Sequence, residues 1–327
     1  MMSEPTIAEV RDAQSAIRRY AVRTPLLESP LVNESIGGRL LVKAEALQTT
    51  GSFKLRGALN RISRLSDAEK ARGIVAYSSG NHAQAVAYGA RVFGTRAIIV
   101  MPEDAPATKV AKTRAYGGDV VFYDRYNENR TETAHKIRDE RGATLIPPYD
   151  DPHVIAGQGT VGLEVVEQAA EMDTQIDAFL VCCAGGGLTA GCALALEAAA
   201  PQARVFGVEP EGFDDTRRSL EAGTPVANDP GARSICDAIL IDRPGSLTFP
   251  INQRLLAGVL VVSDAEAMSA MATAQTEYKI AVEPGGAVAL AAALTGKLDV
   301  KGKTVAVVCT GGNVDPAMFI EALQTGS

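Results

Sequence analysis

Six short apolar runs recur along the chain, and longer amphipathic stretches separate them. Runs of this length, rich in aliphatic residues, are typical of buried strands, whereas the stretches between them suit helices. The alternation predicts an α/β fold with mostly parallel sheets, because each connection has room for a crossover helix. The runs are Ile74–Tyr77, Ala97–Met101, Val120–Tyr123, Phe179–Cys183, Val205–Val208 and Thr304–Cys309.

The first three runs are spaced by roughly 22 to 25 residues, which predicts a compact βαβ unit. Arg72-Gly73 and Pro147-Pro148 bound this unit in the sequence. We therefore expect a small domain, residues 72–147, inserted in a large domain made of residues 1–71 and 148–327. A chain of 327 residues, 46% of them hydrophobic, has enough apolar side chains for two domain cores.

The composition argues against several classes of partner and location. A net charge of −7 without a basic cluster argues against nucleic acid. The uncharged stretch Ala178–Leu196 carries three consecutive glycines, so a buried strand, loop and helix is expected there instead of a membrane span. Glu4 and Glu9, with no apolar segment beside them, argue against a secretory signal. Five cysteines without a CxxC pair fit a reduced, cytoplasmic compartment.

One lysine has a sequence setting that suits a nucleophilic amine. Lys54 stands between the polar turn Thr49–Ser52 and a helix-like stretch, Ala58–Ile62, with no acidic residue nearby. In the first turn of a helix the positive end of the macrodipole disfavours the ammonium form, which favours attack by the neutral amine. Taken alone, Lys54 is more simply an exposed helix lysine, and the other motifs have to decide.

Two glycine-containing turns lead into apolar helices, as anion-binding sites require. Ser78–His82 precedes a helical stretch, so its hydroxyls, amide and backbone N–H groups could hold a carboxylate. Ala184–Leu188 follows the run Phe179–Cys183, and its glycines let the backbone approach a phosphate. A plain turn and a flexible loop are the alternatives. Near the C-terminus, Thr310 follows the run Val305–Cys309, where a hydroxyl could meet a ring nitrogen.

One stretch matches the residue pattern of a nicotinamide-binding motif but lacks its structural context. Gly157–Gly162 satisfies GxGxxG, and Asp177 follows about 20 residues later, the spacing of a dinucleotide site. The apolar run Val154–Ala156 is too short after Pro152 for a core strand, and Asp177 precedes the next strand instead of ending it. This stretch therefore does not predict nicotinamide binding.

Four motifs together resemble the pyridoxal-phosphate enzymes of fold type II, which share the tryptophan synthase β-like fold of two domains, each with a mostly parallel open sheet flanked by helices. The resemblance covers nearly the whole chain, in motif order and separation. Its motifs are Ser52-Phe53-Lys54, Ser78–His82, Gly185–Leu188 and Thr310–Asn313.

Two details place the resemblance in one branch of this superfamily. His82 after Asn81, and the stretch Ile155–Thr160, are typical of the branch that holds serine/threonine dehydratases, serine racemases and hydroxyaspartate dehydratases. Cysteine synthases carry a different residue after the loop asparagine. The resemblance therefore favours elimination or racemisation over β-replacement.

The resemblance implies a role for each motif. Lys54 would carry pyridoxal phosphate on its amine, exchange it for the substrate amine, and then remove the α-proton. Ser79 matches the opposite-face acid or base of the racemases, with a plain loop donor as the equal alternative. The implied carboxylate contacts are Ser78, Asn81 and His82. The implied cofactor contacts are Lys54, Phe53 on a ring face, Asn81 at the ring hydroxyl, Thr310 at the ring nitrogen, and Ala184, Gly185, Gly186, Gly187 and Leu188 at the phosphate.

The implied reaction is a β-elimination. A hydroxyl such as that of Thr310 does not hold the ring nitrogen protonated, so loss of a β-leaving group is favoured over transamination. A β-hydroxy amino acid would lose water, and the released enamine would hydrolyse to a 2-oxo acid and ammonia. We expect an ammonia-lyase. A racemase with side elimination is one alternative, and a binding protein without turnover is another, although Lys54 and the phosphate loop are intact.

Two residues bear on the substrate. Arg130 matches a substrate-side arginine of serine racemases and hydroxyaspartate dehydratases, and its guanidinium could hold a second carboxylate. Asp237 matches a residue that faces the substrate in the racemases. A solvated residue at a helix start is the alternative for Arg130, and a structural role at a helix start is the alternative for Asp237. The pair favours 3-hydroxyaspartate, with serine and threonine close behind, or a serine- or aspartate-type racemase as the alternative.

A metal site and an assembly are also implied by the resemblance. Glu209 and Asp215 would supply carboxylate oxygens and Phe213 its backbone carbonyl, a set suited to Mg²⁺, or else Ca²⁺ or Mn²⁺. An acidic surface turn is the alternative. Homodimers are usual in the family, so a homodimer that acts on a small amino acid, away from membranes and nucleic acid, is expected.

Overall fold

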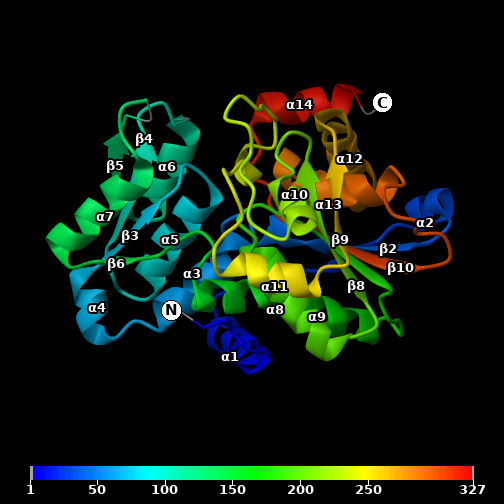
Figure 1. Cartoon of the computed structure of the whole chain (residues 1–327), viewed down its shortest axis with the longest axis horizontal. Coiled ribbons are helices and arrows are strands. Elements are labelled where there is room, and N and C mark those ends of the chain that lie inside the picture. The colour runs from blue at the N-terminus through cyan, green and yellow to red at the C-terminus, as the bar shows by residue number, and fades with distance from the viewer. Residues whose placement is uncertain (1–2, 106, 125, 326–327) are drawn as a thin grey trace.

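The computed structural model describes residues 3–105, 107–124 and 126–325. Two separate sheets, each flanked by helices, lie next to each other in the molecule (Figure 1). All but one of the strand pairings within these described ranges are parallel. The expected α/β fold with mostly parallel sheets is therefore confirmed.

The larger sheet has six strands, and its antiparallel pairing joins β1 to β2. The last strand of the chain enters the middle of the sheet, where Val305 pairs with Leu40 on one side and Ala178 on the other. In spatial order the strands are β1 (Leu26–Glu28), β2 (Arg39–Ala44), β10 (Thr304–Cys309), β7 (Ala178–Cys182), β8 (Arg204–Pro210) and β9 (Gly258–Val262).

The smaller sheet has four parallel strands from one continuous part of the chain. In spatial order they are β5 (Gly118–Tyr123), β4 (Ala97–Pro102), β3 (Ile74–Tyr77) and β6 (Thr144–Leu145). The helices next to them in the sequence are α4 (Asp67–Arg72), α5 (Asn81–Val92), α6 (Ala107–Ala115) and α7 (Arg130–Arg141).

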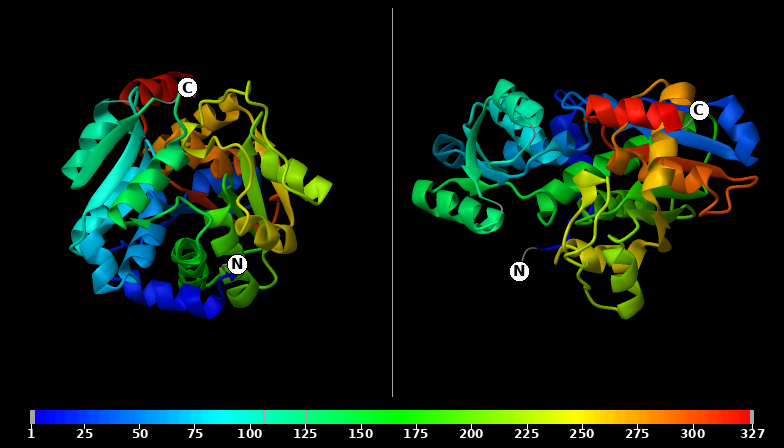
Figure 2. Two further views of the ribbon diagram at one scale, coloured as in Figure 1. Left: turned by 60° about the vertical axis from the view of Figure 1, so that its left-hand side comes forward. Right: turned by 90° about the horizontal axis from the view of Figure 1, so that it is seen from above.

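The remaining helices surround the larger sheet or lie between the two sheets (Figure 2). They are α1 (Ile7–Ile17), α2 (Pro30–Ile36), α3 (Lys54–Ser63), α8 (Pro152–Glu171), α9 (Gly187–Ala199), α10 (Asp215–Ala222), α11 (Thr248–Leu255), α12 (Asp264–Tyr278), α13 (Pro284–Leu294) and α14 (Pro316–Thr325), with short 3₁₀ turns η1 (Glu45–Leu47) and η2 (Asp237–Ile239).

The GxGxxG stretch lies inside α8 and not at a strand-to-helix turn. A Cβ on Gly157 would lie 2.7 Å from Cα of Gly57, so this glycine allows close packing of α8 on α3. The stretch therefore lacks the strand-to-helix turn on which a dinucleotide site is built.

Helix α3 connects the two sheet regions. Its apolar residues Leu59 and Ile62 share a buried cluster with Ile74 and Ile99 of the smaller sheet. On the other side, Gly57 of α3 packs against α8. The boundaries at residues 72 and 147 stay a prediction, and α3, which they assign to the large domain, contributes to both cores.

Four strands lie outside the six expected runs. β1 and β6 have three and two residues, too short for a pattern to reveal them. β2 carries a charge, Lys43, that is fully buried and ion-paired with Glu164 at 2.7 Å. The run Gly258–Val262 has the composition of a strand and becomes β9. In the described part of the chain, no helix is both long and apolar enough to cross a membrane.

Candidate active site

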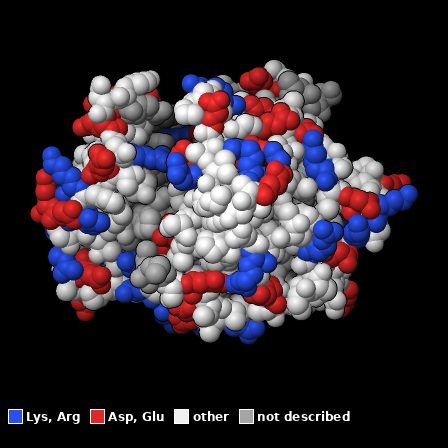
Figure 3. Space-filling model, viewed as in Figure 1, with Lys and Arg blue, Asp and Glu red and all other residues white. Residues whose placement is uncertain are grey.

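One cavity collects side chains from both sheet regions, and Figure 3 shows the hollow between them. One wall comes from the turn after β3 and from α6 and α7, and the other from the turn after β7, from η2 and from the end of β10. Parallel strands bind ligands beyond their carboxyl ends, which is where these segments lie. All predicted cofactor and substrate residues line this cavity.

Lys54 is the first residue of α3, as its sequence setting predicts. The preceding loop is tied to the end of β10, because Ser52 and Gly311 form a β-bridge and the N–H of Phe53 donates to the carbonyl of Thr310 at 3.0 Å. Lys54 Nζ donates to the carbonyl of Pro148 at 2.9 Å. Burial lowers the pKa of Lys54 to about 8, so a sizeable fraction of this amine is neutral near physiological pH.

The amide of Asn81 is held from both ends. Its Nδ2 donates to Oε1 of Glu283 at 2.5 Å, and its Oδ1 accepts from Nδ2 of Asn313 at 2.8 Å. These bonds fix which end of the amide is nitrogen and leave its second N–H for another acceptor. Glu283 is 4% exposed, and burial raises the pKa of its carboxyl to about 7.

The rest of the turn after β3 supplies hydroxyls and an imidazole. Ser78 and Ser79 line the cavity, and Ser78 Oγ accepts from the N–H of Gly80 at 3.2 Å. His82 Nε2 donates to the carbonyl of Ile146 at 2.9 Å, because a carbonyl only accepts. Burial lowers the pKa of His82 to about 3, so the ring is neutral and its buried Nδ1 has no partner among the described residues. His82 can therefore donate to a carboxylate through its backbone N–H only.

The glycine turn after β7 forms an uncapped helix start. Gly186, with φ 84°, is the N-cap of α9, and no side chain of the described residues caps that helix. A Cβ on Gly185 would overlap the ring of Tyr149, and one on Gly187 would lie 3.0 Å from Cβ of Tyr149. Glycine is therefore required here both for backbone conformation and for space. The free N–H groups of this turn suit an anion.

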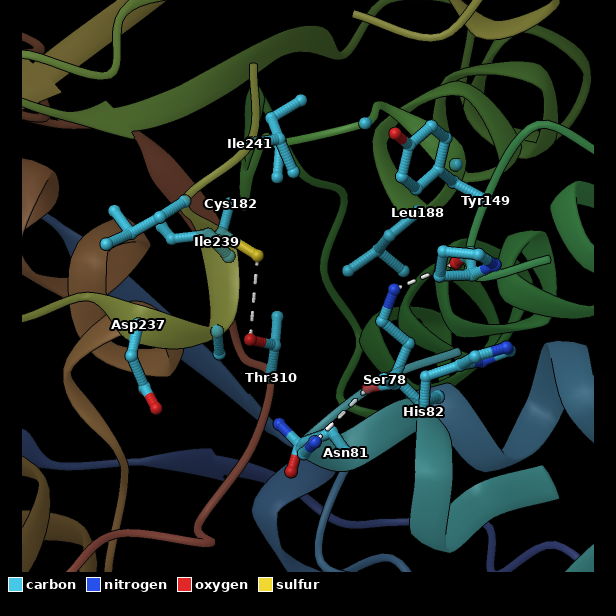
Figure 4. Close-up of a pocket in the computed structure, with 18 of the residues that line it drawn as sticks. Ser78, Asn81, His82, Tyr149, Cys182, Leu188, Asp237, Ile239, Ile241 and Thr310 are labelled. Atoms are coloured by element: carbon cyan, nitrogen blue, oxygen red, sulfur yellow. Dashed lines mark hydrogen bonds between the residues drawn. The ribbon is translucent and has the colours of Figure 1, made fainter. Parts of the chain in front are cut away.

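Thr310 follows β10 at the base of the cavity. Its Oγ1 lies 3.5 Å from Sγ of Cys182 at the end of the neighbouring strand β7, a contact drawn in Figure 4. Burial raises the pKa of Cys182 to about 11, so the thiol stays protonated at neutral pH. The hydroxyl is therefore held between a neutral thiol and the cavity, where it can meet a ring nitrogen.

The two predicted substrate residues have different surroundings. Arg130 is the first residue of α7, and its guanidinium carbon lies 5.8 Å from the ring centre of Tyr77. In the described ranges no carboxylate pairs with Arg130. Asp237 begins η2 and is ion-paired, because Lys109 Nζ lies 2.5 Å from its Oδ2. Figure 4 shows Asp237 across the cavity from Ser78 and His82.

The predicted metal residues are apart from this cavity. Glu209 lies near the C-terminus of β8 and accepts from the N–H groups of Thr216 and Arg217, both at 3.0 Å. Asp215 begins α10, is 1% exposed, and has one carboxylate oxygen, Oδ2, without a partner among the described residues. Within the described ranges no three His, Cys, Asp or Glu residues form a metal cluster. The predicted set has only two residues of these types, Glu209 and Asp215, because its third ligand is the backbone carbonyl of Phe213. It therefore falls below the three residues that such a cluster needs.

Among the cavity-lining residues that sequence reasoning missed are Lys109, Tyr149, Cys182 and Glu283. Glu283 had a usable signal, because Glu283-Pro284-Gly285-Gly286 is another turn that starts an apolar helix. Tyr149 follows two prolines that were used only as a boundary. Lys109 and Cys182 had no signal, since nothing in their neighbours distinguishes them from a surface lysine and a core cysteine.

A family model described as "Pyridoxal-phosphate dependent enzyme" matches residues 17–311. The chain belongs to this family. Its relatives include an L-threo-3-hydroxyaspartate ammonia-lyase of Saccharomyces cerevisiae, 42% identical over 96% of this chain and 95% of that one. A serine racemase of Schizosaccharomyces pombe is 42% identical over 98% of each chain. The solved structure of maize serine racemase superposes with a TM-score of 0.92 at 38% identity, covering 98% of each chain.

The cavity of this pyridoxal-phosphate dependent enzyme fits the cofactor. A lysine amine of lowered pKa, an uncapped glycine turn and a strand-end hydroxyl line one cavity, and these are the groups that an aldehyde, a phosphate and a pyridine nitrogen require. A side chain on Gly185 or Gly187 would press against Tyr149 at this turn. The resemblance and the fold class that the motifs predict are both confirmed.

Proposed function

We propose that the protein is an ammonia-lyase that dehydrates a β-hydroxy α-amino acid to a 2-oxo acid and ammonia, with 3-hydroxyaspartate as its preferred substrate. Relatives named as hydroxyaspartate and threonine ammonia-lyases support the reaction class. The observation that carries the substrate is Arg130, a cavity-lining residue whose guanidinium carbon lies 5.8 Å from the ring centre of Tyr77 and which has no carboxylate partner in the described ranges. Serine and threonine carry no second carboxylate for it.

The chain's own residues account for the proton steps. When bound, pyridoxal phosphate supplies an electron sink for the charge that develops at the substrate's α-carbon. Lys54 Nζ takes the α-proton, and its depressed pKa favours the neutral amine that this task needs. The carbonyl of Pro148 orients this amine. Loss of water leaves an enamine, and its hydrolysis releases the 2-oxo acid and ammonia.

Polar groups on the turn after β3 hold the substrate's α-carboxylate in this proposal. The donors are the hydroxyl of Ser78 and the backbone N–H groups of Asn81 and His82, since the side-chain amide of Asn81 is assigned to the cofactor's ring hydroxyl. Leu188 and Ile239 line the same cavity, and an apolar wall strengthens the electrostatic contacts that charged groups make beside it.

Racemisation is the second candidate, and Ser79 is the observation that favours it. Its side chain lines the cavity, and none of the hydrogen bonds within the described ranges uses its hydroxyl. A proton donor on the face opposite Lys54 would return a proton with inversion. Chiral analysis of recovered substrate separates the two, because formation of the D-enantiomer faster than 2-oxo acid release would make the protein a racemase first.

A divalent cation, Mg²⁺ in the first place, is part of the proposal. Glu209 and Asp215 are both buried, and burial raises the pKa of their carboxyls to about 8 and about 6. Two buried carboxylates with one oxygen unpartnered in the described part of the chain favour a cation between them and the Phe213 carbonyl. We expect Mg²⁺ to raise the melting temperature and Asp215→Asn to remove that rise. Glu211→Gln, on the exposed part of the same loop, is the control.

The proposal also includes a homodimer in the cytoplasm. The five cysteines are all free and buried in the structure, which suits a reduced compartment. Light scattering on the purified holoenzyme measures the assembly, and a monomeric mass at working concentration would remove the dimer from the proposal.

The deciding experiment compares release of 2-oxo acid from L-threo-3-hydroxyaspartate, L-serine and L-threonine by the holoenzyme with Mg²⁺. We expect 3-hydroxyaspartate to have the highest kcat/KM, and Arg130→Ala to lower it by about tenfold or more. Arg138→Ala removes a charge from the exposed face of the same helix and should leave kcat/KM unchanged. Faster turnover of serine or threonine, with no effect of Arg130→Ala, would make the protein a general dehydratase.

A further inference from the structure

Three successive connections of the smaller sheet contribute to the cavity, and each leaves the carboxyl end of a parallel strand. The turn Ser78–His82 follows β3, Lys109 on α6 follows β4, and Arg130 at the start of α7 follows β5. Two of the three thus bring a cation to the same cavity. In Figure 3, lysine and arginine side chains lie at the upper rim of the hollow.

Lys109 is paired with a residue from the other side of the cavity. Its Nζ lies 2.5 Å from Oδ2 of Asp237, and the two side chains are 24% and 57% exposed. Arg130, by contrast, has no hydrogen bond or ion pair among the described residues, and its guanidinium lies over the ring of Tyr77. Arg130 is therefore open to a ligand, whereas Lys109 is held by the carboxylate of Asp237. We call the part of the cavity beside these two cations its distal end.

We propose that Lys109 is a second cationic contact for the distal carboxylate of a dicarboxylate amino acid, and that Asp237 is the counter-ion which that carboxylate replaces. This inference rests on the proposed 3-hydroxyaspartate activity and adds a specificity-determining pair to it. Serine has only hydrogen and threonine only a methyl group where the carboxylate would be, so they leave the pair of Lys109 and Asp237 intact.

The physical chemistry of the pair favours exchange. An ammonium has three donors, so Lys109 can contact a substrate carboxylate before its bond to Asp237 is broken. A surface ion pair contributes little net stability, and Asp237 is well solvated once released. A substrate carboxylate contacted by both Lys109 and Arg130 has two cationic partners, whereas Asp237 has Lys109 as its one ion-pair partner among the described residues.

A simple tie between the two sheet regions is the competing interpretation. Two other residues of this region make such ties, because Lys112 donates to Asn313 at 3.2 Å and the hydroxyl of Tyr116 to the carbonyl of Thr49 at 3.3 Å. A tie would act on all ligands alike, and losing either partner would have the same effect. Exchange predicts opposite effects for the two partners, and only on dicarboxylates.

Binding of two ligands that lack an α-hydrogen tests the proposal without turnover. 2-Methylaspartate carries the distal carboxylate, and 2-aminoisobutyrate does not. Their Kd values are measured on the holoenzyme from the change in cofactor absorbance, and the readout is the ratio of the two. We expect Lys109→Ala to weaken the binding of 2-methylaspartate by about tenfold relative to that of 2-aminoisobutyrate. We expect Asp237→Asn to strengthen the binding of 2-methylaspartate relative to the same reference ligand.

The control is Lys112→Ala, which removes the same charge from the same helix and should leave the ratio unchanged. The proposal is overturned if Lys109→Ala shifts both ligands by one factor, or if Asp237→Asn acts in the same direction as Lys109→Ala. A preference for 2-methylaspartate that is lost in Arg130→Ala and kept in Lys109→Ala defeats this inference alone. No preference in the unaltered enzyme defeats it together with the proposed substrate.

Discussion

Asn81 Nδ2 lies 2.5 Å from Oε1 of Glu283, a carboxyl that is 4% exposed and comes from a part of the chain 202 residues away. Together with the bond from Asn313, this contact sets the orientation of the Asn81 amide. An amide fixed in this orientation presents an N–H, not a carbonyl, to a ligand in the cavity. Glu283 is thus a positioning residue for the predicted contact to the cofactor's ring hydroxyl.

Replacing Glu283 should therefore weaken cofactor binding through Asn81. We expect Glu283→Ala to raise the Kd of pyridoxal phosphate about fivefold, the equivalent of the ~1 kcal/mol of one hydrogen bond. Glu283→Gln keeps an acceptor for the Asn81 N–H and should stay near the unaltered protein. Fluorescence titration of the apoprotein measures both, and equal Kd values for the Ala variant and the unaltered protein would remove this role.

The lowered pKa of Lys54 predicts how cofactor uptake depends on pH. Only the neutral amine attacks an aldehyde, and burial lowers the pKa of Lys54 to about 8, so its neutral fraction increases with pH and levels off above that value. The rate of uptake by the apoprotein, followed by absorbance and divided by the rate of a free lysine analogue, should fall as pH rises above about 8. A constant ratio up to pH ~10 would show an ordinary lysine pKa. Lys54→Ala should retain no covalently bound cofactor after borohydride reduction.

The glycine turn gives a steric prediction with a built-in rescue. A Cβ on Gly185 overlaps the ring of Tyr149, so Gly185→Ala should weaken cofactor binding strongly while helical content is kept. Removing the ring in a Gly185→Ala, Tyr149→Ala double variant should restore much of that binding, because the overlap disappears. Dialysis against free cofactor followed by absorbance measures retention. A double variant as weak as the single one would show that the overlap with Tyr149 is not the cause of the loss.

Two residues beyond Lys54, Arg56 holds a buried ion-pair network beneath the site. Its guanidinium contacts Oε1 of Glu45 and Oε1 of Glu164, each at 2.7 Å, and it is 1% exposed. Arg56→Ala leaves both carboxylates buried without this partner, and we expect the free energy of unfolding to fall by ~3–5 kcal/mol.

An exposed pair provides the control for this network. Arg23 and Glu171 lie 2.6 Å apart with side chains 45% and 61% exposed, so Arg23→Ala should lower the free energy of unfolding by no more than ~1 kcal/mol. Urea unfolding of the two variants measures the difference. Equal losses of unfolding free energy in the two variants would mean that the buried ion pairs of Arg56 contribute no more to stability than a solvent-exposed pair.

Local patterns in the chain were enough to predict the α/β class, the start of a helix at Lys54 and two glycine turns before helices. Strand runs such as Ile74–Tyr77 and Thr304–Cys309 have bounds in the structure identical to those predicted. These features depend on neighbours in sequence, through side-chain periodicity and turn chemistry. The motifs that resemble the family are of the same local kind, and so the cofactor could be predicted from them.

The tertiary structure alone decided which groups meet. Glu283 reaches Asn81 because the turn before α13 packs on the end of β10, and Lys109 reaches Asp237 because α6 closes on η2. β2 was hidden because the charge of Lys43 has a counter-ion on α8, far away in sequence. Burial, ion pairing and the pKa of a side chain depend on such distant neighbours, and no local pattern of residues contains them.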